Sequence, residues 1–134
     1  MTSSHLHAES AAVRTAWGNL TDAFLRGDWA PYREFFVDAP DFRMIHPDGR
    51  EWLSGPDEFA RVYRERIKGT SAWDVATTRF DVSVAPDGMV AWTAAEVSID
   101  AGDWNQTAWQ LAVWQKVDGR WRVSSAMSAN VPPE

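Results

Sequence analysis

Four extended segments separated by short turns fill the second half of the chain, and this pattern restricts the fold more than any other feature. The turns between them read APDG, DAGD and DG, and the segments span residues 73–84, 89–99, 104–117 and 120–128. Their side chains show much of the two-residue alternation of strands. An Asp-Gly pair between two such segments is a strong hairpin signal. The sequence therefore predicts an antiparallel meander of four long strands.

Helical patterns occupy the first half. Apolar residues recur at helical spacing over residues 8–26, and a shorter apolar face spans residues 30–37. A third helix is predicted over residues 55–69, between Gly-Pro and a final glycine. We interpret the basic residues in its last turn as solvated charges that complement the helix dipole: Arg64, Arg66 and Lys68. Helices followed by antiparallel strands predict an α+β domain.

Composition excludes several classes of function. The sequence predicts one domain over residues 1–134, with residues 1–7 flexible, and this length can bury a core. The chain has no cysteine for thiolate or iron–sulfur chemistry, and its net charge of −6 disfavours nucleic-acid binding. Neither a signal peptide nor a membrane-spanning run is recognisable, so a cytoplasmic location is expected. No metal-ligand cluster or nucleotide motif occurs, and we expect neither metal nor cofactor.

The predicted meander carries apolar side chains on both faces. The assumed register places residue 85 opposite 88, 100 opposite 103, and 117 opposite 120. One face then contains Ala76, Phe80, Val97, Trp114 and Met127, among others, and the other contains Trp73, Val75, Thr77, Trp92, Trp109, Leu111 and Val113. A meander that exposes one face to water should be polar there. We expect the helices to cover one face and a second copy of the chain to cover the other, giving a homodimer through the sheet.

Charged residues interrupt the second face. Arg79, Asp81 and Glu96 fall in mid-strand among apolar residues, and the assumed register makes Arg79 and Glu96 diagonal neighbours. Charges in such surroundings need partners or water. Two interpretations remain open: a structural ion pair, or the floor of a cavity between the sheet and the helices.

His46 is the one histidine inside the folded pattern. It ends a short predicted strand in the segment DFRMIHPDGREW, residues 41–52, and the turn Pro47-Asp48-Gly49 follows it. An imidazole has an unperturbed pKa near 6.5, which suits acid–base chemistry. His46 could be a catalytic group, a ligand contact or a polar strand end.

The order of these elements resembles a known superfamily. The segment FLRGDWAPYREFFVDAPDFRMIHPDGREWLSGPDEF and the hairpin VDGRWRV are similar to the nuclear transport factor 2-like (cystatin-like) superfamily, and specifically to its SnoaL-like and ketosteroid isomerase-like branches. The resemblance implies three N-terminal helices packed on a strongly bent, mixed but mainly antiparallel sheet. In this family the sheet forms a cone, and the ligand enters the open end.

The resemblance also carries site residues. In ketosteroid isomerases the general base is a carboxylate immediately before the proline that ends the first strand, and His46 holds that position here. The two oxyanion donors of those enzymes align with Leu20 and Val113, which cannot donate a hydrogen bond. Losing such donors slows the reaction, so we do not expect the isomerase's own reaction.

Three functions fit the sequence. The first is a cofactor-free isomerase, cyclase or dehydratase that acts on a small apolar or aromatic molecule, with His46 as acid or base and with Arg79 and Glu96 orienting or polarising the substrate. The second is a ligand-binding protein without chemistry, and the third is a dimeric assembly module whose cone is filled by side chains. The expected substrate-binding residues are Trp17, Tyr32, Phe36, Trp52, Tyr63, Trp92 and Trp109.

Overall fold

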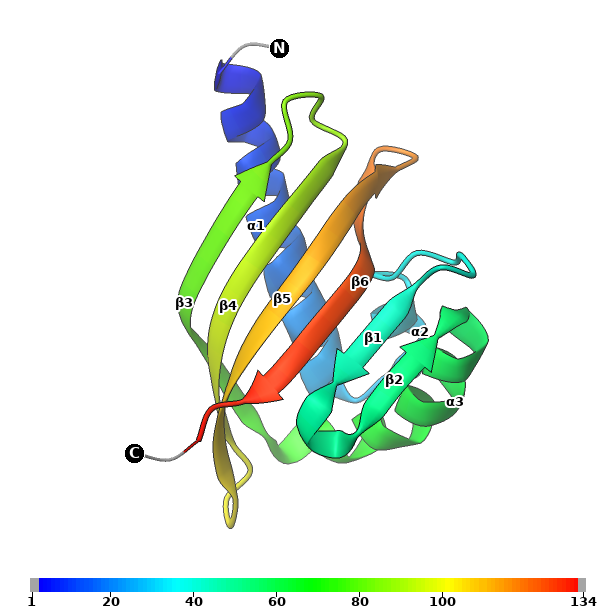
Figure 1. Ribbon diagram of the computed structural model, residues 1–134. Helices are drawn as coiled ribbons and strands as arrows, with labels where there is room; N and C mark the ends of the chain where they lie inside the picture. Colours follow the sequence, from blue (N-terminus) through cyan, green and yellow to red (C-terminus); the bar gives the residue numbers. More distant parts are fainter. Residues whose placement is uncertain (1–2, 133–134) are drawn as a thin grey trace.

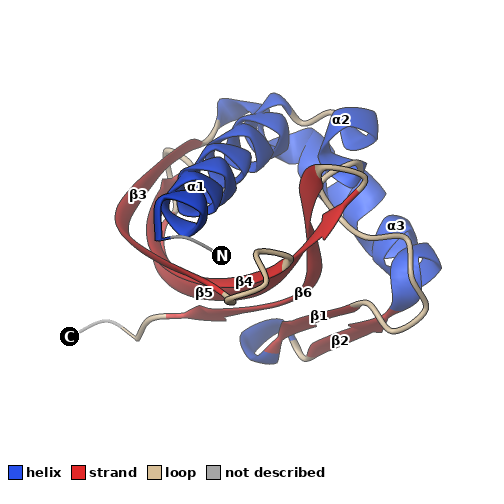
Figure 2. Ribbon diagram, turned by 90° about the horizontal axis from the view of Figure 1, so that it is seen from above, coloured by secondary structure: helices blue, strands red, loops and turns tan. Residues whose placement is uncertain are grey.

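The computed structural model describes residues 3–132 and shows a curled sheet wrapped around a long helix (Figures 1 and 2). The residues predicted to be flexible are helical from Ser3 onward, while Met1 and Thr2 lie outside the described residues. The helices are α1 (Ser3–Arg26), α2 (Trp29–Arg33) and α3 (Gly55–Arg66), with short 3-10 helices η1 (Pro47–Gly49) and η2 (Ile67–Ala72). The strands are β1 (Arg43–His46), β2 (Glu51–Ser54), β3 (Asp74–Val84), β4 (Val90–Asp100), β5 (Asn105–Val117) and β6 (Arg120–Asn130).

The sheet confirms the predicted fold class. Its six strands follow the order β2-β1-β6-β5-β4-β3, and all neighbours are antiparallel except β1 and β6, which are parallel. The long strands form the expected meander. Figure 2 shows this sheet curling around α1 without closing, with the helices on its concave side. The helices α1, α2 and α3 leave the convex side uncovered, as both views show for the described residues.

Two of the three predicted strand registers are wrong by two residues. Val84 pairs with Ala91, and Asp100 pairs with Asn105, because each turn is wider than assumed. The wider turns are held by Asp87 and Asp100, whose side chains accept backbone N–H bonds. A shift of two residues leaves each side chain on its predicted face. The third register is confirmed near its turn, where Val117 pairs with Arg120.

Two β-bulges change the faces of nearby residues. The register shifts between Thr77 and Arg79 on β3, and again in the β5–β6 ladder beside Val113 and Trp114. One extra residue reverses the alternation beyond it. The predicted faces are therefore wrong for the residues beyond the bulges: Trp73, Val75 and Thr77 face the helices, whereas Ala76 and Met127 face outward.

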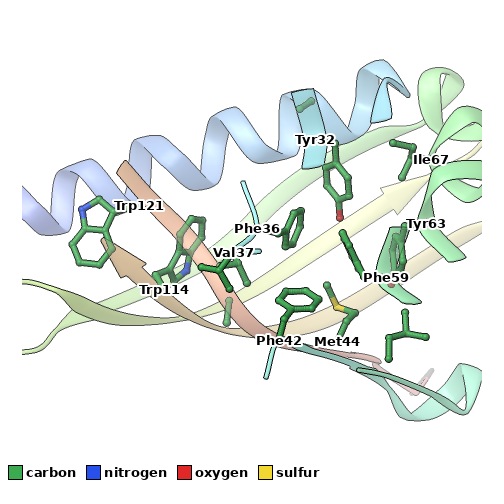
Figure 3. Packing of buried hydrophobic residues seen from close by; sticks show 14 of the residues in the cluster. Tyr32, Phe36, Val37, Phe42, Met44, Phe59, Tyr63, Ile67, Trp114 and Trp121 are labelled. Carbon is green, nitrogen blue, oxygen red and sulfur yellow. The ribbon is translucent and has the colours of Figure 1, made fainter. Parts of the chain in front are cut away.

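An aromatic cluster joins the short helices to the sheet (Figure 3). Phe59 of α3 is fully buried, and its ring centroid lies 4.7 Å from that of Phe36, 5.1 Å from that of Phe42 and 4.8 Å from that of Tyr63. Such ring pairs contribute about 0.5–1.5 kcal/mol each beyond their buried area. The cluster thereby fixes α3 over the end of β1, where the candidate site lies.

Candidate active site

A cavity of about 270 Å³ lies between the concave face of the sheet and the helices. Apolar side chains form most of its wall. They include Trp17, Leu20 and Phe24 from α1, Phe36 from the segment after α2, and Val97, Ile99, Ala108, Ala112 and Val123 from the sheet. A largely apolar pocket with a few polar groups is the usual make-up of a small-molecule site. The cone therefore retains open space instead of being filled by its own side chains.

Two tyrosines place hydroxyl groups at this cavity. Tyr32 comes from α2 and Tyr63 from α3, and both side chains are buried. Burial disfavours the charged phenolate and raises the pKa of Tyr32 far above its ordinary value. Burial also raises the pKa of Tyr63, and this effect exceeds the opposing influence of Arg66. Both hydroxyls therefore remain protonated at neutral pH and can donate hydrogen bonds.

Arg66 adds the cation of the site. Its Nη1 and Nη2 donate to the two carboxylate oxygens of Glu51 at 2.8 and 2.6 Å, and its guanidinium carbon lies 4.8 Å from the ring centre of Tyr63. The hydrogen bond to Arg66 lowers the pKa of Glu51 and in return raises that of Arg66. Arg66 is exposed in the last turn of α3, as predicted, but it also lines the cavity, which the sequence analysis did not predict. Its spacing of three residues from Tyr63 places both on one helix face and was the available signal.

His46 lies at the cavity where β1 ends, opposite Glu51 in the β1–β2 ladder. Its Nδ1 accepts a hydrogen bond from the backbone N–H of Gly49 at 3.1 Å. A neutral imidazole that accepts at one nitrogen carries its proton on the other, so Nε2 is the donor. The turn is also held against the end of β6, because the Asp48 carboxylate accepts the backbone N–H of Asn130. The local backbone thus fixes both the ring and its tautomer.

Two tryptophans outside the set of predicted site residues also border the cavity. Trp73 follows η2, and Trp104 immediately precedes β5. Their ring centroids are 5.4 Å apart, and Trp104 is partly exposed. The sequence offered one signal for this pair: both residues immediately precede long strands, β3 and β5. The face prediction grouped Trp73 with Trp92 and Trp109, which lie on the outer face, because it did not include the bulge in β3 that reverses the alternation.

The structure brings only half of the predicted site residues together. His46, Trp17, Tyr32, Phe36 and Tyr63 line the cavity. The others lie on the outer face of the sheet: Arg79, Glu96, Trp52, Trp92 and Trp109. The aligned Val113 also points outward, while its inward neighbour Ala112 likewise offers no donor.

Arg79 and Glu96 belong to an exposed polar group on that outer face. They are directly opposite each other, so the predicted diagonal arrangement is wrong. Glu96 accepts hydrogen bonds from the Trp109 indole at 2.9 Å and from the Thr78 hydroxyl at 3.0 Å, which lowers its pKa. Arg79 lies 3.9 Å from Asp81, and both side chains are largely exposed. These charged residues therefore do not form the floor of a cavity between the sheet and the helices, which was one of the two interpretations left open by the sequence.

Around these charges lies an apolar surface that we call the outer apolar patch. Its members are between 39% and 57% exposed: Trp92, Trp109, Leu111, Val113 and Met127. The strand pairing extends it through Ile45 to Trp52, which is the most exposed large apolar side chain among the described residues. A contiguous exposed patch of this kind is typical of an interaction surface.

Residues 3–132 offer neither a cluster of potential metal ligands nor a helix suited to a membrane. Their histidines and acids form no group of three or more that could hold a metal ion. In the same part of the chain, no helix combines the length and apolar character needed to cross a membrane.

Comparison with protein families identifies the relatives of this cavity-bearing cone. A family model described as a SnoaL-like domain matches residues 13–131. The chain belongs to this SnoaL-like family. The match covers every strand and most of the helical layer, and it therefore includes the whole cavity wall. None of the curated proteins matches the chain.

Solved structures share the fold of this SnoaL-like protein. A candidate dehydratase of the NTF2-like family from Streptomyces avermitilis has a TM-score of 0.80 at 22% identity, covering 95% of this chain and 99% of its own. A ketosteroid isomerase-like protein from Erwinia carotovora atroseptica has a TM-score of 0.69 at 21% identity, covering 93% and 98%. A cystatin-like fold protein from Burkholderia xenovorans has a TM-score of 0.75 at 16% identity, covering 95% of each chain. At these identities the likeness concerns the fold alone.

Proposed function

We propose that the cone is a binding site for a small apolar or aromatic molecule and that His46 takes part in cofactor-free proton transfer there. The cavity of about 270 Å³ carries this proposal. An enclosed cavity of roughly 150 Å³ already admits a benzene ring, so this one has room for a larger, fused-ring ligand. Its aromatic wall supplies the contact area, and Tyr32, Tyr63, Arg66 and His46 supply the polar contacts.

The geometry favours a particular role for His46. With Nδ1 accepting from Gly49, the neutral ring offers Nε2–H to a ligand oxygen and polarises it. The carbon-bound proton then leaves to solvent hydroxide, or to Nδ1 of His46 once its bond to Gly49 breaks. The two buried tyrosine hydroxyls can stabilise charge that develops on the same ligand. Isomerisation, cyclisation and dehydration all proceed through such charge development. The names of two structural neighbours, a candidate dehydratase and a ketosteroid isomerase-like protein, support this class of reaction.

Deuterium exchange tests the proposal without knowledge of the natural substrate. A ring ketone with acidic C–H bonds, such as 2-tetralone, is incubated with the protein in deuterated buffer, and incorporation is followed by NMR. We expect exchange above the buffer rate, and a loss of about 100-fold or more in that excess for His46→Phe. His46→Gln separates two roles of the histidine, because the glutamine amide still donates a hydrogen bond but cannot transfer a proton. If His46 acts only as a donor, His46→Gln should retain part of the exchange rate. If His46 transfers the proton, His46→Gln should lose the excess exchange.

His7→Gln is the matched control, because His7 is an exposed histidine on α1 and should leave exchange unchanged. Exchange no faster than buffer, combined with measurable binding of the ketone, would leave the second function, a binding protein without chemistry. Neither exchange nor binding would refute the proposal as a whole.

The outer apolar patch supports a second candidate function, homodimerisation through the sheet. Large apolar side chains dominate this face, and water-exposed area of this kind favours burial against a partner. A two-fold interface places the same surface against itself. Arg79, Asp81 and Glu96 supply both signs of charge on one face, so two copies can pair opposite charges across the axis.

Sedimentation tests the dimer directly. We expect a dimer mass at micromolar concentration and a monomer mass for Val113→Asp, which puts a charge inside the patch. Ala12→Asp is the matched control, because it adds the same charge at an exposed position of α1, away from the sheet face. A monomeric wild type would refute this candidate, and so would a Val113→Asp variant that remains dimeric.

A further inference from the structure

The polar groups that face the cavity are mainly hydrogen-bond donors. Arg66 has five N–H groups and no acceptor. Two of these N–H groups are engaged by Glu51, and the Tyr63 hydroxyl also interacts with the guanidinium, so part of its donor capacity is left for a ligand. His46 presents Nε2–H because Gly49 occupies its Nδ1. The buried hydroxyls of Tyr32 and Tyr63 add two further O–H donors.

Carboxylates are excluded from the same surface. Among the described residues that line the cavity, none is an aspartate or glutamate, although the whole chain has 19 of them and a net charge of −6. Glu51 does not line the cavity, and both of its oxygens are held by Arg66. The remaining polar lining residues are neutral: Thr21, Gln110, Ser128 and Asn130. The cavity is thus a donor-rich, cation-containing pocket in an acidic protein.

We infer that the ligand of the cone is an organic acid, with a ring body in the apolar part and a carboxylate or enolate oxygen at Arg66. A charge-assisted bond from guanidinium to such an oxygen is stronger than a neutral hydrogen bond. The contact with the Tyr63 ring holds the guanidinium at the cavity before the ligand arrives, and Glu51 competes with the ligand for its N–H groups. The aromatic pair Trp73 and Trp104 lies beside the cavity and can stack on the ring. This inference rests on the proposed function, since it specifies the class of ligand for the same cavity.

Three probes of one shape test the charge preference. They are 2-naphthoate, which is an anion, 2-acetonaphthone, which is neutral, and 2-(aminomethyl)naphthalene, which is a cation at neutral pH. Affinity is measured by calorimetry at low and high salt. We expect the anion to bind about tenfold or more tightly than the neutral ketone, as a charged hydrogen bond predicts. The cation should bind most weakly, and salt should reduce the preference.

Variants of the ion pair locate the preference on Arg66. Arg66→Gln should remove the advantage of the anion while leaving ketone binding unchanged. Glu51→Gln should tighten anion binding several-fold, because it removes the competing carboxylate but leaves the side chain in place. This increase can be measured even if Arg66→Gln fails to fold, so the inference remains testable. Arg64→Gln is the matched control on the same helix, since Arg64 is exposed, packs on Trp29 and does not line the cavity.

The outcomes separate the two proposals. Equal binding of the anion and the ketone would overturn the inference and leave the cavity as a general apolar site. An anion preference that persists in Arg66→Gln, or one that Arg64→Gln removes, would also overturn it. Anion binding that Glu51→Gln and Arg66→Gln both leave unchanged would show that Arg66 serves Glu51 alone and would overturn the assignment to Arg66. Failure of all three probes to bind would refute the proposed ligand site and this inference with it.

Discussion

The hydrogen bond between Trp114 and Thr93 is a buried polar contact in a largely apolar interior. Trp114 is fully buried, Thr93 is 2% exposed, and the indole Nε1 donates to the threonine Oγ1 at 3.0 Å. Thr93→Val keeps the shape of the side chain but removes the acceptor, so the indole N–H is left buried without a partner. An unsatisfied buried donor costs about 1–3 kcal/mol. We expect Thr93→Val to lower the free energy of unfolding by that amount.

Urea denaturation followed by circular dichroism measures this difference, since tryptophan fluorescence would change with the mutated contact itself. Thr93→Ser is the control, because it keeps the hydroxyl and loses one methyl, which costs about 0.8 kcal/mol in lost burial plus a small cavity term. In the double variant Trp114→Phe/Thr93→Val, the cost of Thr93→Val should largely disappear. Our reasoning is refuted if Thr93→Val is as stable as the wild type, or if its cost is unchanged in the Trp114→Phe background.

Three further predictions concern charge and backbone. Glu51→Gln should destabilise the protein more at about pH 7 than under acid conditions, because the folded-state pKa of Glu51 is lowered and its stabilisation is lost as the pH falls through that value. Denaturation at a series of pH values below about 7 shows this, and an equal cost at every pH would contradict it. The wild type should lose stability above about pH 10, because the folded-state pKa of Tyr32 is raised and only the unfolded tyrosine ionises near its ordinary value. Tyr32→Phe should remove part of this loss. Parallel curves of stability against alkaline pH for the variant and the wild type would argue against it. Gly27→Ala should lower the free energy of unfolding by at least about 1–2 kcal/mol, because Gly27 has φ +72° and a Cβ would lie 2.9 Å from a carbonyl oxygen. Gly18→Ala, in open space within α1, should instead raise it by about 0.5–1 kcal/mol. Urea unfolding measures both, and a Gly27→Ala variant more stable than Gly18→Ala would contradict the prediction.

The candidate site could be predicted in part. His46 and the helix aromatics Trp17, Tyr32 and Tyr63 were predicted as site residues, and all of them line the cavity. Each lies on an element that nearby residues mark in the sequence, either by the spacing of apolar residues or by the turn after His46. Arg66 was not predicted, because a basic residue in a last helical turn has the same local pattern whether it faces water or a cavity. Its partner Glu51 comes from a different element, and that contact exists only after folding.

The sequence by itself determined the helices, the long strands, their turns and the α+β class, because helical periodicity, strand alternation and turn residues act over short stretches of chain. Tertiary structure alone decided which face of each strand meets the helices. A single extra residue in β3 and another in the β5–β6 ladder reverse the alternation, and no local pattern marks either position. Tertiary structure likewise decided that Arg79 and Glu96 lie outside the cone while Arg66 lies at its cavity. These placements depend on strand pairing and helix packing between residues that are far apart in the sequence. The sequence of any one segment therefore cannot reveal them.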